Sequence, residues 1–408
     1  MAETSAVDLS SRMKQLPPYL FGRLNRVKYE LRQKGADIID LGMGNPNDPP
    51  PQLVIDKLCE AVRNPKNHRY STAAGVLNLR REVAKHYAHE YGVNLDPEKE
   101  IISLIGSKEG ISHLCLALLG PGDTAVVPSP AFPIHIYGPA LAGANALSIP
   151  IGTDETFVAR LKDVVENLWP QPKVLILNFP HNPTAATAEL EFYEEVVAFA
   201  RTKKLIILHD FAYCDTVFDG YRAPSIFQVK GARDIAVEFT TMSKPYNMAG
   251  WRIGFCVGNE HIVHALERVK GYYDYGLFQA VQIAAIVAIR HCRKDSAQQA
   301  LVYQQRRDVL CDGLNRNGWS VPKPKGTMFV WAPIPEPFRA MGSMDFALML
   351  MEEAEVAVAP GIGFGPNGEG FLRLALVENE LRLKQAVRQI TRALRAKSAQ
   401  TAHARSHA

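Results

Sequence analysis

The residues best able to do chemistry follow short apolar runs in the middle of the chain. Lys244 comes directly after one run, with Ser243 before it, and Arg252 lies just before the next run. A lysine amine forms imines with carbonyl compounds, and two cations beside hydroxyl groups attract an anion. Most lysines at a strand end are simply solvated. The pair therefore indicates a nucleophilic amine beside an anion site only if other groups join it.

Three further polar groups follow other apolar runs. Asp210 ends a run, where a buried carboxylate without a cationic partner is unfavourable. The pyridinium nitrogen of a cofactor is such a partner, and capping of a helix is the competing interpretation. Asn182-Pro183-Thr184 is read equally well as a turn. Gly106-Ser107 opens a helix whose backbone N–H groups are suited to phosphate, although many helices begin in this way.

The elements that must position these groups alternate between short apolar runs and longer amphipathic stretches. Each run is mostly apolar, which is typical of a strand buried on both faces. The stretches, such as residues 190–202, have the period of helical crossovers. This alternation predicts a mostly parallel sheet flanked by helices, in which ligands bind beyond the carboxyl ends of the strands. The expected strands are residues 101–104, 124–127, 174–177, 205–208, 236–239 and 253–257.

The length of 408 residues predicts two domains, because single cores stop growing at roughly 250–300 residues. We expect residues 51–288 to form a large domain that holds the site. Residues 289–396 are expected to form a smaller α+β domain, which the N-terminal segment 1–50 joins. The polar tail 397–408 is expected to be disordered. The expected elements of the smaller domain are helices at 302–318 and 381–396 and strands at 328–331, 354–358 and 371–376.

Composition and charge argue against several function classes. A hydrophobic content of 47% and a charged content of 22% are those of an ordinary soluble protein. The net charge of +4 is small, so neither nucleic acid nor a membrane surface is an expected partner. No apolar run reaches the roughly 20 residues of a membrane helix, and the first residues lack a secretory signal. The six cysteines show no zinc-ligand spacing, so we expect free thiols, a cytoplasmic location and no metal.

Together these segments resemble the pyridoxal-phosphate-dependent aminotransferases of class I/II, which have fold type I, over nearly the whole chain. Ser243-Lys244-Pro-Tyr-Asn-Met-Ala-Gly-Trp-Arg252 is similar to the family's lysine signature, with Pro245 where Ser is more usual. The resemblance implies that Lys244 holds pyridoxal 5'-phosphate as a Schiff base and that Arg252 binds its phosphate. It also implies that Asp210 pairs with the pyridine nitrogen.

The same resemblance implies roles for other residues around the cofactor. Asn182 and Tyr213 match the residues that hydrogen-bond the ring oxygen, and with Lys244 and Asp210 we expect Tyr213 to be catalytic. Phe132 resembles the aromatic residue that stacks on the pyridine ring, and a core phenylalanine is the competing interpretation. His135 resembles the histidine that supports the aspartate, and a merely buried histidine competes. The remaining cofactor-binding residues that the resemblance implies are Ser107, Lys108, Thr241 and Ser243.

Tyr70 resembles the tyrosine that reaches the phosphate from the partner subunit. The resemblance therefore implies a homodimer with shared active sites. A solvent-facing tyrosine in a monomer is the competing interpretation.

For the substrate, the resemblance implies that Arg373 clamps the α-carboxylate, with Gly44, Asn182 and Tyr19 also in contact. Within the class the chain is most similar to the bacterial glutamate–pyruvate (alanine) transaminases. We therefore expect alanine and 2-oxoglutarate to give pyruvate and glutamate. The diaminopimelate aminotransferases share some of these segments, so a diaminopimelate, aspartate or aromatic specificity stays open.

Two other classes of protein compete with the aminotransferase. A decarboxylase or β-eliminating lyase of the same fold would use the same Arg373 clamp and differs in needing no 2-oxo acid. A non-enzymatic regulator would carry a DNA-binding head, whereas here no basic recognition helix precedes the fold. The intact Lys244, Asp210 and Arg252 also favour an enzyme.

Overall fold

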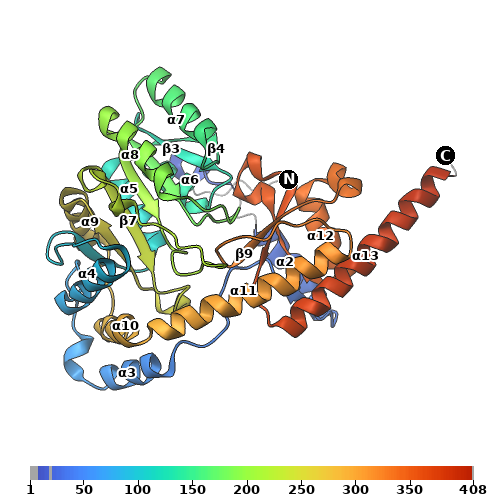
Figure 1. Cartoon of the computed structure of the whole chain (residues 1–408), viewed down its shortest axis with the longest axis horizontal. Helices are drawn as coiled ribbons and strands as arrows, with labels where there is room; N and C mark the ends of the chain where they lie inside the picture. Colours follow the sequence, from blue (N-terminus) through green and yellow to red (C-terminus); the bar gives the residue numbers. More distant parts are fainter. Residues whose placement is uncertain (1–7, 18–20, 407–408) are drawn as a thin grey trace.

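The computed structural model describes residues 8–17 and 21–406. Tyr19, which was expected to contact the substrate, lies outside the described residues. The chain forms a larger part built on a broad sheet and a smaller part built on a narrow sheet, and the long helix α11 (Arg293–Arg316) runs from one to the other (Figure 1). None of the helices in the described ranges is long and apolar enough to cross a membrane.

In the described ranges, the larger part contains a seven-stranded sheet of order β2-β8-β7-β6-β5-β3-β4. Neighbouring strands are parallel except at β8, which is antiparallel to both β2 and β7. The expected mostly parallel sheet is therefore confirmed. The strands are β2 (Ile101–Leu104), β3 (Thr124–Ser129), β4 (Asn145–Pro150), β5 (Val174–Asn178), β6 (Ile206–Asp210), β7 (Ala236–Thr241) and β8 (Gly254–Gly258).

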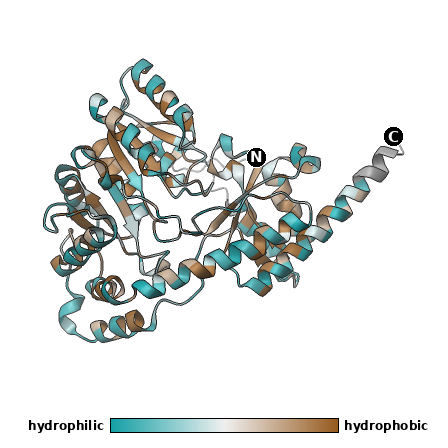
Figure 2. Ribbon diagram, in the orientation of Figure 1, coloured by the Kyte–Doolittle hydropathy of each residue, from teal (hydrophilic) through white to brown (hydrophobic). Residues whose placement is uncertain are grey.

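Both faces of this sheet are covered, which explains the continuous apolar runs of its strands (Figure 2). In β5, Leu175 and Leu177 point into one core and Val174 and Ile176 into the other. The first core is closed by α4 (Leu77–Tyr91), α7 (Glu155–Asn167), α8 (Leu190–Lys203) and α10 (Gln279–His291), with α3 (Gln52–Val62) packed on α10. The second core is closed by α5 (Ser107–Leu118), α6 (Pro133–Leu141) and α9 (Glu260–Tyr273).

The smaller part has an antiparallel sheet of order β11-β12-β9 and a two-stranded pair in which β1 runs parallel to β10. The pairing of β1 with β10 brings the N-terminal segment beside the C-terminal part of the chain. The division into domains at residues 50 and 288 stays a prediction. The elements are β1 (Ile39–Asp40), β9 (Phe329–Pro333), β10 (Val356–Ala357), β11 (Ala359–Pro360), β12 (Phe371–Ala375), α2 (Phe21–Gln33), α12 (Gly342–Ala354) and α13 (Glu380–Ser406). The short helix α1 (Ser11–Lys14) instead lies beside α6 of the larger part.

Several expected boundaries differ from those in the structure. The strand expected at 354–358 begins later, because Ala354 ends α12 and Glu355 follows in a left-handed conformation with φ of 54°. Helix α13 continues to Ser406, so residues 397–406 of the expected disordered tail are helical. Short 3₁₀ helices occur at Pro65–His68, Ile226–Gln228, Ala232–Asp234, Ala249–Trp251, Glu336–Met341, Gly361–Phe364 and Pro366–Gly368.

Candidate active site

Polar side chains meet at the carboxyl ends of β5, β6 and β7, where parallel strands finish at the same edge of the sheet. Asn178, the last residue of β5, donates from Nδ2 to the carbonyl oxygen of Asp210 over 2.7 Å. Its Oδ1 accepts from the backbone N–H of Asn182 at 2.9 Å. Asn178 thus ties the end of β6 to the Asn182 loop. The sequence interpretation gave Asn178 no role, although an asparagine ending a buried apolar run is a usable signal.

Only one of the two carboxylate oxygens of Asp210 has a hydrogen-bond partner among the described residues. Its Oδ2 lies 2.9 Å from Nε2 of His135, and both residues are buried. Its Oδ1 is also buried and has no hydrogen-bond partner among the described residues. A buried carboxylate oxygen without a partner is unfavourable. The Asp210 side chain therefore fits a ligand that brings an N–H donor or a positive charge to Oδ1, and His135 fixes its orientation.

Lys244 follows β7 by three residues and points its amine at the opposite wall of the site. Its Nζ donates to the carbonyl oxygen of Gly44 over 3.0 Å and lies 5.9 Å from the centre of the Tyr213 ring. Burial, together with the positive charges of Arg373 and Arg252, lowers the pKa of Lys244 to about 8, while the charge of Asp210 acts against this shift. Lys244 is therefore an amine that loses its proton close to neutral pH.

Arg373 on β12 is a buried cation with a fixed plane. Its Nη1 donates to Oδ1 of Asn182 over 2.8 Å, and its Nη2 donates to the carbonyl oxygen of Gly42 over 3.0 Å. Its guanidinium carbon lies 4.1 Å from the centre of the Phe329 ring and 4.6 Å from that of Phe364. Two aromatic walls and two acceptors hold the guanidinium in one orientation, as bidentate binding of a carboxylate requires.

Gly44 and Tyr213 lie beside these two cations. A Cβ at Gly44 would come within 2.6 Å of the Phe329 ring, so the backbone passes the site at a distance that only glycine allows. Burial raises the pKa of Tyr213, while the charge of Arg373 and a hydrogen bond with Asn182 act against that rise. The Tyr213 phenol therefore stays protonated and is a hydrogen-bond donor across the physiological pH range.

The start of α5 and the loop before β8 form a positively charged end of the site. A Cβ on Gly106 would lie 2.4 Å from Nη2 of Arg252, and the φ of 79° at Gly106 also favours glycine. Nη1 of Arg252 donates to the carbonyl oxygen of Ala249 over 3.0 Å. Ser107 is the first residue of the helix, whose free N–H groups attract anions. The Arg252 side chain and this helix start thus combine in one place suited to phosphate.

The hydroxyl groups expected near the phosphate lie together, since Oγ1 of Thr241 is 2.9 Å from Oγ of Ser243 and both residues are buried. Phe132 is half-buried, with its ring 5.8 Å from that of His135, and Lys108 Nζ lies 5.7 Å from the centre of the Phe132 ring. Phe132 thus lies beside the His135–Asp210 pair and is not a fully buried core residue.

Tyr70 is separated from these residues within its own chain. Its side chain is 92% exposed, and its ring packs against Tyr275, with the ring centres 5.8 Å apart. Tyr275 and the nearby Tyr272 and Tyr273 are themselves exposed, at 60%, 91% and 67%. The four tyrosine rings therefore form an exposed aromatic cluster on the surface of the chain.

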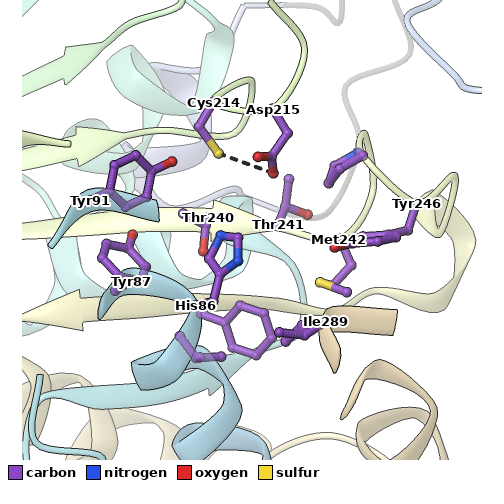
Figure 3. Close-up of a pocket in the computed structure, with 13 residues that line it drawn as sticks. His86, Tyr87, Tyr91, Cys214, Asp215, Thr240, Thr241, Met242, Tyr246 and Ile289 are labelled. Carbon is purple, nitrogen blue, oxygen red and sulfur yellow. Dashed lines mark hydrogen bonds between the residues drawn. The ribbon is translucent and has the colours of Figure 1, made fainter. Parts of the chain in front are cut away.

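A small cavity of about 30 Å³ lies on another side of the lysine loop, between α4 and α10 (Figure 3). Figure 3 shows His86 and Tyr87 facing Cys214 and Asp215 across it, and Sγ of Cys214 donates to Oδ2 of Asp215 at 3.6 Å. Burial raises the pKa of Cys214. The cavity has room for about one water molecule and lies next to the site around Lys244, since Thr241 lines it.

A second cluster of ionisable side chains joins α5 to α9. Glu109, His113 and Asp274 lie within reach of one another, as metal ligands would. Nζ of Lys270 lies 3.0 Å from Glu109 Oε1 and 3.1 Å from Asp274 Oδ2, and Lys270 is fully buried. The lysine ammonium therefore supplies the positive charge, and the cluster is an ion-pair network.

The comparisons with known proteins agree with this geometry. The model of the family "Aminotransferase class I and II" matches residues 36–390. The chain is 50% identical to the glutamate-pyruvate aminotransferase AlaC of Escherichia coli, covering 97% of this chain and 96% of the relative. It is 44% identical to the LL-diaminopimelate aminotransferase of Moorella thermoacetica, covering 94% and 97%. The solved structure of substrate-bound BacF from Bacillus subtilis superposes with a TM-score of 0.87 at 33% identity, covering 95% and 98%.

Proposed function

The chain belongs to the class I and II aminotransferases, with fold type I and aminotransferase activity, and from this premise we propose its substrates, its cofactor and the roles of its residues. The reaction is alanine plus 2-oxoglutarate to pyruvate plus glutamate. The observation that carries the choice of substrates is the 50% identity, over 97% of the chain, with a glutamate–pyruvate aminotransferase.

The cofactor is pyridoxal 5'-phosphate, and the described residues fit it at two separate points. The unpartnered Oδ1 of Asp210 would accept the hydrogen of a protonated ring nitrogen. The Gly106–Ser107 helix start and Arg252 would hold the phosphate, with the Thr241 and Ser243 hydroxyl groups nearby. The remaining residues around it are Lys244, Asn182, Tyr213, Phe132 and Lys108. When bound, the cofactor accepts the electrons left on Cα after a proton is removed.

Lys244 is the proton carrier of the reaction. Its pKa of about 8 leaves part of the amine unprotonated near neutral pH, which a general base needs. Nζ would take the proton from Cα of the amino acid and deliver it to the aldehyde carbon of the bound cofactor. Asp210 keeps the ring nitrogen protonated, and His135 keeps the Asp210 carboxylate in place. Tyr213 donates its phenol hydrogen to the ring oxygen.

Arg373 selects the α-carboxylate of the substrate. Its guanidinium is already oriented by Asn182, the Gly42 carbonyl and two aromatic rings, so little freedom is lost when a carboxylate binds. Gly44 lets the backbone pass close to the same place. Fixing the carboxylate and the ring together places Cα within reach of Lys244.

A panel of amino donors tests the choice of substrates. Purified enzyme with added cofactor is assayed with alanine, LL-diaminopimelate, aspartate and phenylalanine against 2-oxoglutarate, and with glutamate against pyruvate. We expect the alanine and glutamate–pyruvate pairs to give the highest kcat/KM. A far higher value for diaminopimelate would replace the proposed specificity, and the 44% identity with a diaminopimelate aminotransferase makes it the second candidate.

The competing β-eliminating or decarboxylating reaction is tested by leaving out the amino acceptor. Transamination stops after one half-reaction without a 2-oxo acid, whereas elimination continues. Alanine tests decarboxylation, and serine, which carries a leaving group on its β-carbon, tests elimination. We expect no sustained turnover of either amino acid until 2-oxoglutarate is added.

The working unit is a homodimer in which each active site takes Tyr70 from the partner chain. Exposed aromatic residues are typical of interfaces, and Tyr70 lies in such a group with Tyr272, Tyr273 and Tyr275. An exposed position and a phosphate contact are compatible if the loop crosses to a second copy. We place the enzyme in the cytoplasm, where its six free cysteines stay reduced.

A further inference from the structure

The segment from Leu41 to Asp48 supplies the carbonyl groups that contact Arg373 and Lys244. The Gly42 carbonyl accepts from Arg373, and the Gly44 carbonyl accepts from Lys244. At its start the segment is fixed to the strand of Arg373, because the N–H of Ala375 donates to the carbonyl of Leu41 over 2.7 Å. What fixes its other end decides where the two carbonyl groups lie.

That other end is held by an ion pair with the long helix α11. Nη1 and Nη2 of Arg306 donate to the two carboxylate oxygens of Asp48 over 2.8 and 2.9 Å. Arg306 is buried, and its Nη1 also reaches the carbonyl groups of Leu376 and Val377 at 3.4 Å, directly after the strand of Arg373. The Arg306 guanidinium therefore contacts both segments that line the proposed carboxylate site: residues 41–48 and the end of the strand of Arg373.

The same carboxylate is linked to the lysine loop. Nε2 of Gln299, also on α11, donates to Asp48 over 3.0 Å. Nδ2 of Asn247, three residues after Lys244, donates to Oε1 of Gln299 over 3.0 Å and to the carbonyl of Pro49 over 3.3 Å. Burial raises the pKa of Asp48, but the hydrogen bonds of Arg306 and Gln299 outweigh burial, so its pKa is lowered and the carboxylate is charged.

We propose that Asp48 and Arg306 are positioning residues for the substrate carboxylate. By fixing the far end of residues 41–48, the pair sets the width of the space between that segment and Arg373. Without this ion pair the segment is free to shift, and the carboxylate then binds in more than one orientation. The inference rests on the proposed role of Arg373, and it adds two residues that touch neither substrate nor cofactor.

Two variants test the pair. Asp48→Asn breaks the charge pair, and Asp48→Asn with Arg306→Gln removes both charges and leaves no unpaired buried arginine. We expect each to raise KM for alanine about tenfold, within the range by which misplacement lowers kcat/KM, and to change kcat much less. The double variant is expected to have a KM no higher than that of Asp48→Asn, because the two substitutions remove the same interaction. Asp48→Glu is expected to restore most of the affinity.

A second measurement does not depend on turnover. The dissociation constant of propionate, a carboxylate without an amino group, is measured by calorimetry on cofactor-free protein. We expect both variants to raise the dissociation constant of propionate by about the same factor as they raise KM, since one carboxylate site sets both constants. Activity absent from wild-type enzyme counts against the proposed function. Propionate binding that is unchanged in both variants counts against the positioning role.

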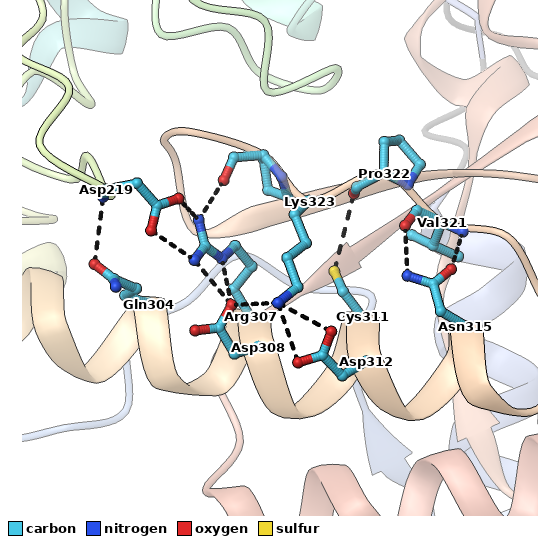
Figure 4. Close-up of polar contacts among 11 residues, drawn as sticks. Asp219, Gln304, Arg307, Asp308, Cys311, Asp312, Asn315, Val321, Pro322 and Lys323 are labelled. Atoms are coloured by element: carbon cyan, nitrogen blue, oxygen red, sulfur yellow. Dashed lines mark hydrogen bonds and ion pairs between the residues drawn. The ribbon is translucent and has the colours of Figure 1, made fainter.

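The neighbouring Arg307 offers a matched control on the same helix (Figure 4). Nη1 and Nη2 of Arg307 donate to the carboxylate of Asp219 over 2.5 and 3.1 Å, on a side of α11 that faces other loops. Asp219→Asn therefore also breaks a bidentate ion pair of α11. We expect it to leave KM and the propionate constant unchanged. An equal rise of KM in Asp219→Asn would mean that any lost anchor of α11 has this effect, and the specific role of Asp48 would be wrong.

Discussion

The ammonium group of Lys244 donates to the carbonyl oxygen of Gly44 over 3.0 Å, although 200 residues separate them in sequence. A carbonyl is a neutral acceptor and does not offset the loss of hydration of a buried cation. The protonated lysine is therefore disfavoured in the folded chain. Lys270, in contrast, is buried between the carboxylates of Glu109 and Asp274.

The first prediction is that Lys244→Met stabilises the cofactor-free protein at neutral pH. The folded pKa of about 8 lies below the ordinary value of 10.5, so the charged lysine weakens folding below pH 8 and the penalty disappears as pH rises to 10.5. A shift of this size corresponds to about 3 kcal/mol. Urea unfolding at pH 7 and pH 10 measures the difference between variant and wild type.

Lys270→Met is the control for this prediction. It removes a buried lysine that has two carboxylate partners, and leaving those carboxylates unpaired is destabilising. The two substitutions are therefore expected to act in opposite directions at pH 7. If Lys244→Met instead destabilises the cofactor-free protein at pH 7 as much as Lys270→Met does, the assigned cause of the low pKa is incorrect.

The second prediction concerns Asp210. Asp210→Asn keeps the shape of the side chain but loses the charge that holds a proton on the ring nitrogen. A charge-assisted hydrogen bond contributes roughly 1.5–3 kcal/mol, so kcat should fall about 10- to 100-fold, with little change in the melting temperature. Steady-state kinetics with alanine and 2-oxoglutarate measures this loss.

Asp215→Asn is the matched control, because Asp215 is a nearby half-buried carboxylate that faces the small cavity and Cys214. The kcat of the Asp215→Asn variant should equal that of wild type. Equal rates in Asp210→Asn and wild type would leave Asp210 with a structural role only.

The third prediction is that Gly106→Ala weakens cofactor binding. Its Cβ would displace the Arg252 guanidinium from the start of α5, and the φ of 79° is unfavourable for alanine. Strain of roughly 1–2 kcal/mol predicts an increase of about tenfold in the dissociation constant of pyridoxal 5'-phosphate, measured by fluorescence titration. Gly120→Ala, at a position with open space around the new Cβ, should bind the cofactor as wild type does.

The fourth prediction concerns the exposed Tyr70. Tyr70→Phe and Lys244→Ala homodimers should each be impaired. Refolding the two together gives hybrid dimers in which one site combines an intact Lys244 with an intact Tyr70 from the partner subunit. Activity should therefore rise above that of either parent. An activity that only averages the parents would show that Tyr70 acts within its own chain.

The sequence was most informative where residues are buried on both faces. The apolar runs of β2, β5, β6, β7 and β8 were found because each lies between two layers of helices. The strand β4, at the opposite edge of the sheet from β2, was missed because its Asn145 and Ser148 are exposed and no continuous apolar run forms. The direction of β8 was not predicted either, since a short apolar run reads the same in both directions.

In the candidate site, too, the sequence indicated some residues and not others. Lys244, Asp210 and Arg252 lie at strand ends or in a motif, so the sequence indicated them. Asn178 and the ring of Phe329 were not assigned a role, because their contacts join segments far apart in the chain. The same holds for the pairing of Asp48 with Arg306, which 258 residues separate.

The contact between Gly42 and Arg373 spans 331 residues, and this has a consequence for biosynthesis. A ribosome must deliver the 331 residues from Gly42 to Arg373 before the two halves of the proposed carboxylate site can meet. Contacts of such long sequence separation form slowly, and large proteins expose apolar surface while they wait. Chains that stop before Arg373 would contain the large sheet without the proposed substrate site, so the nascent enzyme is expected to bind its amino acid only after Arg373 has been synthesised.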